Sequence, residues 1–471
     1  MQNERENSEL AEAAGEAMPA AEPSRFNGAG FFLLCVILVF SVVAYGAVDT
    51  WAFGFISILT GLMVLCRLAE SWIAGRLEVG TSPLLLPLGG LILIGLVQLL
   101  PLRSANLEDG LLSIPAVASL SINPYATRLM VAQLILYTIF FGASFVYLNR
   151  PKRLRKIVAL VVIFGAVMAF FGILQRIANP EGIYGLRPTP QSIPFGSFVN
   201  QHHFAAFMEM TAALTLALLV GQATAKDKRL LLIIALVLMT LAILLTGSRG
   251  GLLSLFGVVA FVFLANFLRR ERSGEDVAKS EKHARFRRNL AILGGGLAIV
   301  LLLVSAVVML GGDASLMRGV GLANQADISS GRTHFWAVAW QIFKDYPILG
   351  AGLDAFGTAF PRYDTWNGTL RVEQAHNDYL QTLADAGILG LITVGSFIFL
   401  LFRQGLRRIG GEHSHFGQSA AIGGLAGCFG ILIHSFFDFP LRTSSNGFYF
   451  LLFAVLATAP VVFPHHHHRK K

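Results

Sequence analysis

The chain has 471 residues, of which 54% are hydrophobic and only 14% are charged, and its formal net charge is +9. Soluble proteins carry about a quarter charged residues, so this composition excludes a soluble globular enzyme, a disulfide scaffold and a disordered protein. A polytopic membrane protein remains. The three cysteines, Cys35, Cys66 and Cys428, lie in apolar stretches without zinc-like spacing, and we expect them to be small core residues.

Twelve apolar segments are candidates for membrane-spanning helices, because about 20 helical residues cross the hydrocarbon core of a bilayer. In chain order they are 31–48, 51–67, 83–100, 125–148, 157–178, 203–221, 230–246, 251–268, 290–311, 388–402, 419–437 and 447–463. Only Asp49 and Thr50 separate the first two, which predicts a tight helical hairpin. The sequence thus predicts an all-α polytopic membrane protein with about 12 transmembrane helices, nine within 30–311 and three within 388–463.

The segments outside these spans predict two tails and one large loop. Residues 1–29 are rich in Glu, Ala and Asn and lack the features of a signal peptide, so we expect a disordered tail. Residues 464–471, with their histidine tract, are expected to form a second, solvated tail. The segment 312–387 is far longer than an ordinary loop. It includes an amphipathic stretch with Phe335, Val338, Ala339, Ile342 and Phe343 on one helical face, which predicts an ordered helical cap.

The distribution of basic residues predicts the orientation in the membrane. If the N-terminus is cytoplasmic and the spans alternate, 26 of the 37 Lys and Arg residues fall on the inner side and 11 on the outer side. Cytoplasmic loops of membrane proteins carry such an excess. Both termini are therefore expected in the cytoplasm and the 312–387 loop on the outer face. Because the positive charge is explained by topology, we expect no nucleic-acid partner.

The first polar cluster is FGSFVNQHHFAAFMEM, at 195–210. Asn200 is expected to cap the helix that follows, with His202 and His203 in its first turn. Glu209 comes seven residues after His202 and is expected on the same helical face. An ionisable residue in a membrane helix normally faces a cavity or a partner. The two readings are a His–Glu pair that braces two helices and a sugar-binding or proton-relay role.

The second cluster is the turn LLTGSRGGLLSL, at 244–255. Its glycines allow close approach of the backbone, and Arg249 presents a planar fork of donors that matches two phosphate oxygens at once. The arginine also lies near the start of a helix, where backbone amides favour an anion. The sequence favours phosphate binding here over the alternative of an arginine that reaches to the membrane surface.

Two further clusters contain histidines near helix ends. His376 is followed by Asn377 and Asp378 at the end of the long loop. A neutral imidazole can take a proton from a hydroxyl, as a glycosyl transfer requires, and Asp378 or Glu373 could orient it; a solvated surface histidine is the alternative. The later HSFFDFPLR contains His434, Asp438 and Arg442, for which a helix cap is an equally good explanation.

Several catalytic motifs are absent from the sequence. It contains no DxD pair for a metal and a nucleotide-sugar, and no Walker loop, HExxH or GxSxG. A transferase of this kind is expected to need no bound metal and no other cofactor, and to use a donor without a nucleotide. A lipid-linked diphosphate fits, because arginines could neutralise its charge.

These clusters together resemble the O-antigen ligase and polymerase superfamily of bacterial envelope glycan transferases. The matching pieces are FGSFVNQHHFA (195–205), TGSRGG (246–251), SGRTHFW (330–336), YPILGAGLDAF (346–356), HNDYLQTLADAGILG (376–390) and HSFFDFPLR (434–442). The last piece is similar to members that handle exopolysaccharides. The resemblance rests on the order of the pieces, which extends over about half of the chain, rather than on any single one.

The resemblance implies a helical enzyme with the architecture of a C-type glycosyltransferase, in the bacterial inner membrane with its active site on the periplasmic face. The donor would be a glycan on undecaprenyl diphosphate. The acceptor would be another lipid-linked glycan in a polymerase, which HSFFDFPLR favours, or the lipid A core in a ligase. Arginines of the outer face would bind the diphosphate and a loop histidine would activate the acceptor hydroxyl, with inversion. A transporter, a lipid flippase and an O-acyltransferase are weaker alternatives.

Carried onto this sequence, the resemblance gives a set of expected site residues. His376 is the expected catalytic base. Arg249, Arg187 and Arg332 are expected to bind the diphosphate. Residues expected to bind the glycan or to support the site are Asn200, His202, His203, Glu209, Asn377, Asp378, His434 and Asp438.

Overall fold

A computed structural model of the protein describes residues 25–77, 80–102, 118–178, 182–190, 192–272, 331–366, 368, 371–412 and 414–460. The ninth expected span (290–311), residues 1–24, the C-terminal tail and residues 312–330 of the expected cap lie outside them. The described part of the chain is mainly helical. It has one two-stranded antiparallel sheet, formed by β1 (Gly182–Ile183) and β2 (Arg187–Pro188).

The other eleven expected spans all coincide with α-helices. In chain order these are α2 (Arg25–Val43), α3 (Thr50–Ala74), α4 (Leu85–Gln98), α5 (Pro124–Tyr147), α6 (Pro151–Ala178), α7 (Gln201–Val220), α8 (Arg229–Thr246), α9 (Arg249–Arg272), α14 (Asp378–Gly411), α15 (His415–His434) and α16 (Ser444–Thr458). Two further helices, α12 (Arg332–Asp345) and α13 (Phe356–Tyr363), fall within the expected cap. Short 3-10 turns are η1 (Tyr45–Ala47), η3 (Lys226–Lys228) and η4 (Pro440–Arg442).

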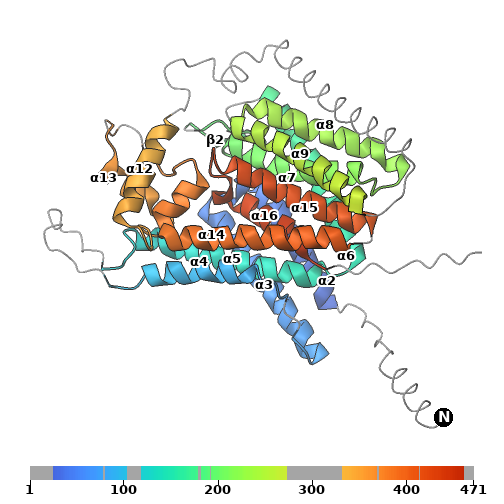
Figure 1. The fold of residues 1–471 in the computed structure, drawn as a ribbon, viewed down its shortest axis with the longest axis horizontal. Coiled ribbons are helices and arrows are strands. Elements are labelled where there is room, and N and C mark those ends of the chain that lie inside the picture. The colour runs from blue at the N-terminus through green and yellow to red at the C-terminus, as the bar shows by residue number, and fades with distance from the viewer. Residues whose placement is uncertain are drawn as a thin grey trace, which may run out of the picture.

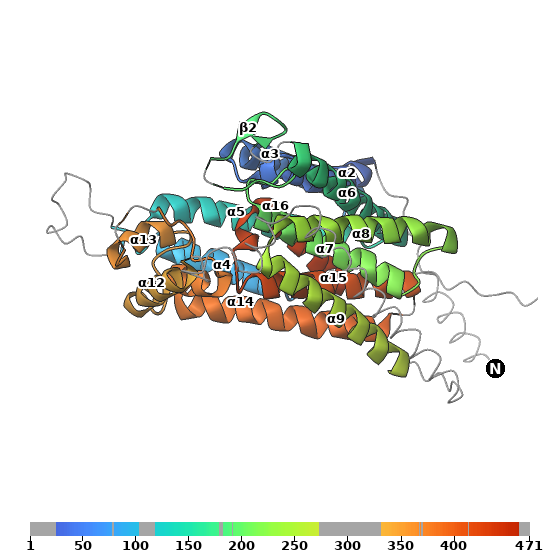
Figure 2. The ribbon, with the colours of Figure 1, turned by 90° about the horizontal axis from the view of Figure 1, so that it is seen from above.

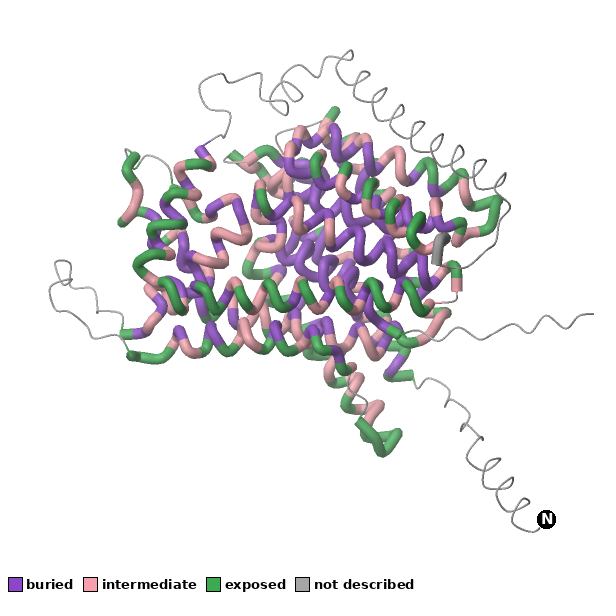
Figure 3. The backbone as a smooth tube through the Cα atoms, in the orientation of Figure 1, coloured by how far each residue is buried: buried purple, intermediate pink, exposed green. Residues whose placement is uncertain are grey.

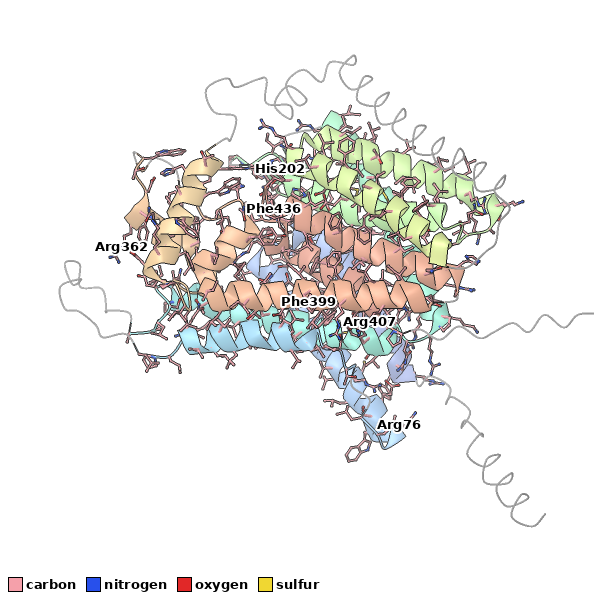
Figure 4. All side chains as sticks on the ribbon, in the orientation of Figure 1. Arg76, His202, Arg362, Phe399, Arg407 and Phe436 are labelled. Atoms are coloured by element: carbon pink, nitrogen blue, oxygen red, sulfur yellow. The ribbon has the colours of Figure 1, made fainter. Side chains whose placement is uncertain are left out.

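The prediction of an all-α polytopic membrane protein is confirmed. Within the described residues, nine helices are long and apolar enough to cross a membrane, while α4 and α16 are shorter, with 14 and 15 residues. Figure 3 shows the buried residues concentrated in the centre of the helix bundle. Exposed apolar side chains such as Phe399 of α14 (Figure 4) lie on the outer surfaces of the helices, as expected where lipid is the solvent.

The helices form a bundle with α7, α15 and α16 at its centre. Figure 2 shows α2, α3 and α6 on one side of these helices and α9 and α14 on the other. Glycines on α15 allow the close packing: a Cβ at Gly423 would lie 2.8 Å from Leu214 Cα of α7, and one at Gly424 would lie 2.7 Å from Phe453 O of α16. Small residues are used in this way where membrane helices approach closely.

Basic residues gather at one end of the bundle. At this basic end, Arg153 at the start of α6 donates to Asn27 O of α2 at 3.1 Å, and Arg269 at the end of α9 donates to Gln418 of α15 at 2.7 Å. The cap helices α12 and α13 lie at the opposite end (Figure 1), where Asn123 of the α5 start donates to Thr358 of α13. We call this opposite end the polar end.

The N-terminal tail boundary expected from the sequence is wrong. Residues Arg25–Ala29 belong to α2 instead of the expected disordered segment 1–29. The side chain of Asn27 is buried and donates to Glu70 Oε1 of α3 at 2.5 Å, so this first turn is tied to the bundle despite its polar sequence. The expected hairpin of α2 and α3 is confirmed, but α2 ends at Val43, earlier than expected, because the residues of η1 have positive φ values.

The cap packs on the first part of α14. The expected apolar face of α12 is confirmed for Phe335, Val338, Ala339 and Ile342, which are buried, whereas Phe343 is only half-buried. Helix α14 is broken at Gly387, where φ is 63° and ψ is −162°. A Cβ there would lie 2.3 Å from the backbone oxygen of Ile348, so a glycine is required. The break separates a cap segment of α14 from the segment that enters the membrane.

Candidate active site

His376 lies at the polar end, where the cap leads into α14. Its φ is +52°, in the left-handed region that residues other than glycine seldom adopt. Its ring lies between Phe335 of α12 and Phe439, at centroid distances of 5.9 and 4.7 Å. Nδ1 lies 3.2 Å from Oδ1 of Asp438, and 29% of the side chain is exposed. His376 is thus held in one orientation while part of its ring stays accessible.

Asp438 is the buried partner of this histidine and follows the end of α15. Only 2% of its side chain is exposed. Oδ1 also accepts from the backbone N–H of Phe439 at 2.9 Å, and Oδ2 has no hydrogen-bond partner among the described residues. Burial alone would raise the pKa of Asp438, but the hydrogen bond with His376 and the nearby His202 hold that pKa well below its usual range. A carboxylate can only accept, so Nδ1–H of His376 is the donor.

Arg332 and His202 complete the cluster from two other elements. Nη2 of Arg332, at the first position of α12, lies 3.6 Å from Oδ2 of Asp438, and Nδ1 of His202 lies 3.9 Å from the same oxygen. His202 is in the first turn of α7, which Asn200 caps as expected: the side chain of Asn200 accepts from His202 N at 2.8 Å. Figure 4 labels His202 on the side of the bundle that faces the cap.

The carboxylate that orients His376 differs from the two that the sequence suggested. Asp378 instead accepts from the hydroxyl of Ser435 at 2.8 Å, and Glu373 pairs with the exposed Arg371. From the sequence, Asp438 is a candidate for glycan binding, for support of the site or for a helix cap, but not for the partner of His376. It is separated from His376 by 62 positions, so local spacing contained no signal for the pair.

The expected association of His202 with Glu209 is also wrong. Glu209 Oε2 lies 3.1 Å from Nδ1 of His434, at the end of α15, and both side chains are at most 1% exposed. A Cβ at Gly250 would lie 3.0 Å from Nε2 of His434, so the start of α9 packs directly on this pair. The reading of Glu209 as part of a pair that braces two helices is correct, with His434 as the partner.

Arg249 is the first residue of α9 and is half-buried at the polar end. The preceding Gly247 ends α8 in the left-handed conformation, with φ 64°. A Cβ at Gly251 would lie 2.9 Å from Ala205 Cβ of α7. The glycines therefore allow this turn to pack against α7 and α15, as the sequence suggested, and they place Arg249 next to the residue that contacts His434.

Arg187 lies apart from the His376 cluster. It forms a bidentate ion pair with Asp49 of the first hairpin, with Nη2 at 3.0 Å from Oδ1, and its guanidinium lies 4.7 Å from the ring centroid of Tyr45. The structure thus brings Arg332 into the cluster and gives Arg187 a different partner.

Two of the expected supporting residues have structural partners. The side chain of Asn377 accepts from the backbone N–H groups of Tyr379 and Leu380, both at 3.0 Å, and so caps α14. His203 Nδ1 lies 2.5 Å from the hydroxyl of Thr443, and its ring packs on Phe439. These contacts hold α14 and the segment after α15 in place beside His376.

A second charged network, centred on Arg442, is not predicted by the sequence. Nη1 of Arg442 donates to Asp354 at 2.9 Å, and Nη2 donates to Asp385 at 2.7 Å. Burial lowers the pKa of Arg442, but these two carboxylates outweigh it and raise that pKa above its usual value. The signal that could have found the network is Asp385, a carboxylate within an otherwise apolar run, which normally needs a buried partner. The network joins η4, the cap and α14.

A cavity of about 210 Å³ lies between α4, α5, α14 and α16. Most of its lining is apolar and includes Leu88, Leu134 and Phe397. Its polar lining includes Asp378, Asp385 and Arg442. The segment that links α15 to α16 therefore contributes both to this cavity, through Arg442, and to the His376 cluster, through Asp438.

Comparison with known families finds a match to part of the chain. A model of the O-antigen ligase family matches residues 234–395. The match covers about a third of the chain and supports its assignment to the O-antigen ligase and polymerase superfamily. A search of curated proteins finds no match. The match agrees with the resemblance of the sequence motifs, and it supports a membrane glycan transferase of the ligase or polymerase type.

The region matched to the O-antigen ligase family covers only part of the cluster. It extends from α8 into α14 and contains Arg249, Arg332 and His376. His202 and Asp438 lie outside it, on either side. The carboxylate that pairs with His376 is therefore supplied by a segment beyond the matched region.

Proposed function

We propose that the protein transfers a glycan from undecaprenyl diphosphate to an acceptor hydroxyl at the periplasmic face of the bacterial inner membrane, and that it polymerises repeat units of an exopolysaccharide or O-antigen. The observation that carries this proposal is the His376–Asp438 pair, with Nδ1 and Oδ1 3.2 Å apart and the imidazole partly accessible. A base held by an ionised carboxylate is suited to activate a hydroxyl.

In the proposed reaction, Nε2 of His376 removes the proton from the acceptor hydroxyl while its oxygen attacks the anomeric carbon of the donor. The bond between that carbon and the phosphate oxygen breaks, and its electron pair leaves with the diphosphate. Asp438 keeps Nδ1 protonated, so that Nε2 can act as the base, and then stabilises the imidazolium. Attack from the side opposite the diphosphate inverts the anomeric configuration.

The negative charge of the departing diphosphate requires cationic groups on the leaving-group side. Arg332, whose Nη2 is 3.6 Å from Asp438, and Arg249 at the start of α9 are the proposed ligands. Arginines that are already in position stabilise charge that increases in the transition state, and so they lower the barrier to the chemical step. The ion pair with Asp49 removes Arg187 from this role in the proposal.

The apolar cavity supports a lipid-linked substrate. It lies among membrane helices and has most of its lining from aliphatic and aromatic side chains. A segment of a prenyl or acyl chain would bury apolar surface there. Since Arg442 contributes to the cavity and Asp438 lies four residues before it, a chain bound in the cavity would keep its headgroup near His376.

The orientation of the chain supports a periplasmic site. The basic end of the bundle carries Arg153, Arg269 and Arg407, whereas the His376 cluster lies at the other end with the cap. By the positive-inside rule, the basic end faces the cytoplasm. The test of sidedness is labelling with a membrane-impermeant maleimide: a cysteine in place of exposed Arg362 (Figure 4) should react in intact spheroplasts, and one in place of Arg407 should not.

A deletion strain tests the function itself. If the protein is a polymerase, we expect single repeat units to accumulate on undecaprenyl diphosphate, and wild-type protein but not His376→Ala to restore long chains. Full-length polymer that is left off the lipid A core would instead indicate the ligase. Glycan trapped on the cytoplasmic side would indicate a flippase and would contradict the proposal.

A further inference from the structure

The cap carries an aromatic platform that the proposed mechanism does not use. The indole of Trp366, which follows α13, is 45% exposed. It stacks on the imidazole of His334 with an interplanar angle of 9° and a centroid distance of 4.2 Å. The platform is therefore the indole ring of Trp366. The imidazole of His334 covers one of its faces, and nearly half of the residue is exposed to solvent.

The platform is held rigidly from beneath. Nε2 of His334 lies 2.7 Å from Oδ1 of Asp364, and the same oxygen accepts from the backbone N–H of Trp366 at 3.0 Å. These two contacts lower the pKa of Asp364, the backbone N–H more than the imidazole, so the carboxylate stays ionised at neutral pH. A single carboxylate thus fixes both stacked rings, and a ligand that binds them would lose little side-chain entropy.

A row of rings connects the platform with the proposed base. Phe335 lies 5.9 Å from Trp366 and 5.9 Å from His376, measured between ring centroids, and its ring is within 30° of parallel to the imidazole. Phe335 is buried, so it links the two sites without being a binding surface itself. The exposed indole is therefore connected to the proposed base, His376, through a single intervening ring, that of Phe335.

We propose that Trp366 stacks on a pyranose ring of the acceptor glycan, near the chain end whose hydroxyl reacts at His376. The proposal rests on the proposed glycan transfer and names a sugar subsite for it. The C–H face of a pyranose is apolar and packs on an aromatic ring, whose face carries partial negative charge. A chain lying across Trp366 would present its end to His376.

The alternative role for an exposed tryptophan is to anchor the protein at the membrane interface. Trp366 directly follows α13, which lies at the outer end of the molecule, beyond the ends of the membrane helices (Figure 1). Its ring is also ordered by His334 and Asp364 rather than left to contact lipid. These features favour a ligand of the cap over a lipid headgroup.

The cap offers a matched control in Trp340 of α12. It is 46% exposed, and its ring packs on that of Phe343, with the centroids 5.1 Å apart. Purified protein in nanodiscs is assayed with lipid-linked glycan from the deletion strain. Because stacking is made equally in the ground and transition states, Trp366→Ala should raise KM for the acceptor about three- to tenfold and leave kcat within about twofold. Trp366→Phe should give a smaller increase, and Trp340→Ala should match wild type.

A binding measurement separates this proposal from the proposed function. The probe is an oligosaccharide released from the host's own polysaccharide by partial acid hydrolysis, titrated into the full-length protein. Wild type and Trp340→Ala should show saturable quenching of intrinsic fluorescence, and Trp366→Phe should lose most of it. Quenching without any glycan transfer would contradict the proposed function only. An unchanged acceptor KM in Trp366→Ala, or a fall in kcat with no change in KM, would overturn the role of the platform.

Discussion

Two of the histidine–carboxylate pairs among the described residues have nearly equal lengths but differ in their access to solvent. His376 Nδ1 and Asp438 Oδ1 are 3.2 Å apart, and His434 Nδ1 and Glu209 Oε2 are 3.1 Å apart. The side chain of His376 is 29% exposed, whereas that of His434 is 1% exposed. The two pairs thus have similar contacts, but a substrate can reach the imidazole of His376 and cannot reach that of His434.

The difference follows from the elements that hold each pair. The buried pair joins two central helices, α7 and α15, and the start of α9 covers it at Gly250. The open pair joins two connecting segments, one before α14 and one after α15. Connecting segments at the end of a bundle leave a side chain partly accessible, while facing helices close over it. Access, rather than the pair itself, distinguishes the candidate base from a structural contact.

The largest effect is expected when the partly exposed imidazole of His376 is removed. We expect His376→Ala to reduce the rate of glycan transfer per folded molecule by about 10³-fold or more, since it removes the proposed general base. Transfer is measured with lipid-linked glycan in nanodiscs. His415→Ala, at the basic end, is the control and should be active. Near-wild-type transfer by His376→Ala would exclude the role as base.

The opposite result is expected for the buried pair. Glu209→Ala leaves His434 buried without its carboxylate and should lower the free energy of unfolding by about 3 kcal/mol. Transfer per folded molecule should remain within about tenfold of wild type. Thermal unfolding in detergent measures the loss of stability. The rate of glycan transfer, divided by the amount of folded protein, measures the effect on activity. A loss of transfer as large as that of His376→Ala in a stable variant would mean that Glu209 takes part in catalysis.

The arginines provide a smaller, paired test. Arg332→Ala should slow transfer about 10- to 100-fold, because one donor to the leaving diphosphate is lost. Arg187→Ala should leave transfer unchanged and cost at most about 1 kcal/mol of stability, because its ion pair with Asp49 is partly exposed. Both rates come from the same assay. Equal losses in the two variants would return Arg187 to the diphosphate site.

The smallest expected effect concerns acid stability. The pKa of Asp438 is held well below its usual value, so in the folded protein it stays ionised when the unfolded chain begins to bind a proton near pH 4. Its stabilising contribution is therefore present above about pH 4 and is lost as the pH falls further. We expect the difference in melting temperature between wild type and Asp438→Asn to be constant from pH 5 to 8 and to shrink below pH 4. A difference that changes between pH 5 and 8 would contradict this assignment.

The helices and the individual polar residues could be predicted from the sequence, but their pairings could not. Apolar runs located every described span, and the motif around His376 identified the candidate base. The expected pairs were local: His202 with Glu209, and His376 with Asp378 or Glu373. The observed partners are instead Glu209 with His434, 225 positions apart, and His376 with Asp438, 62 positions apart.

The composition alone, with 54% hydrophobic and only 14% charged residues, predicts a membrane protein. Such a chain is expected to be helical, because a helix satisfies all of its backbone hydrogen bonds within the bilayer. Its low charge also restricted the candidate site to a few polar clusters. Which of those clusters contact one another follows only from the packing of the helices. In a membrane bundle, close packing of helices far apart in sequence sets which charged groups become neighbours and which remain open, and periodicity along one chain segment contains no information about that choice.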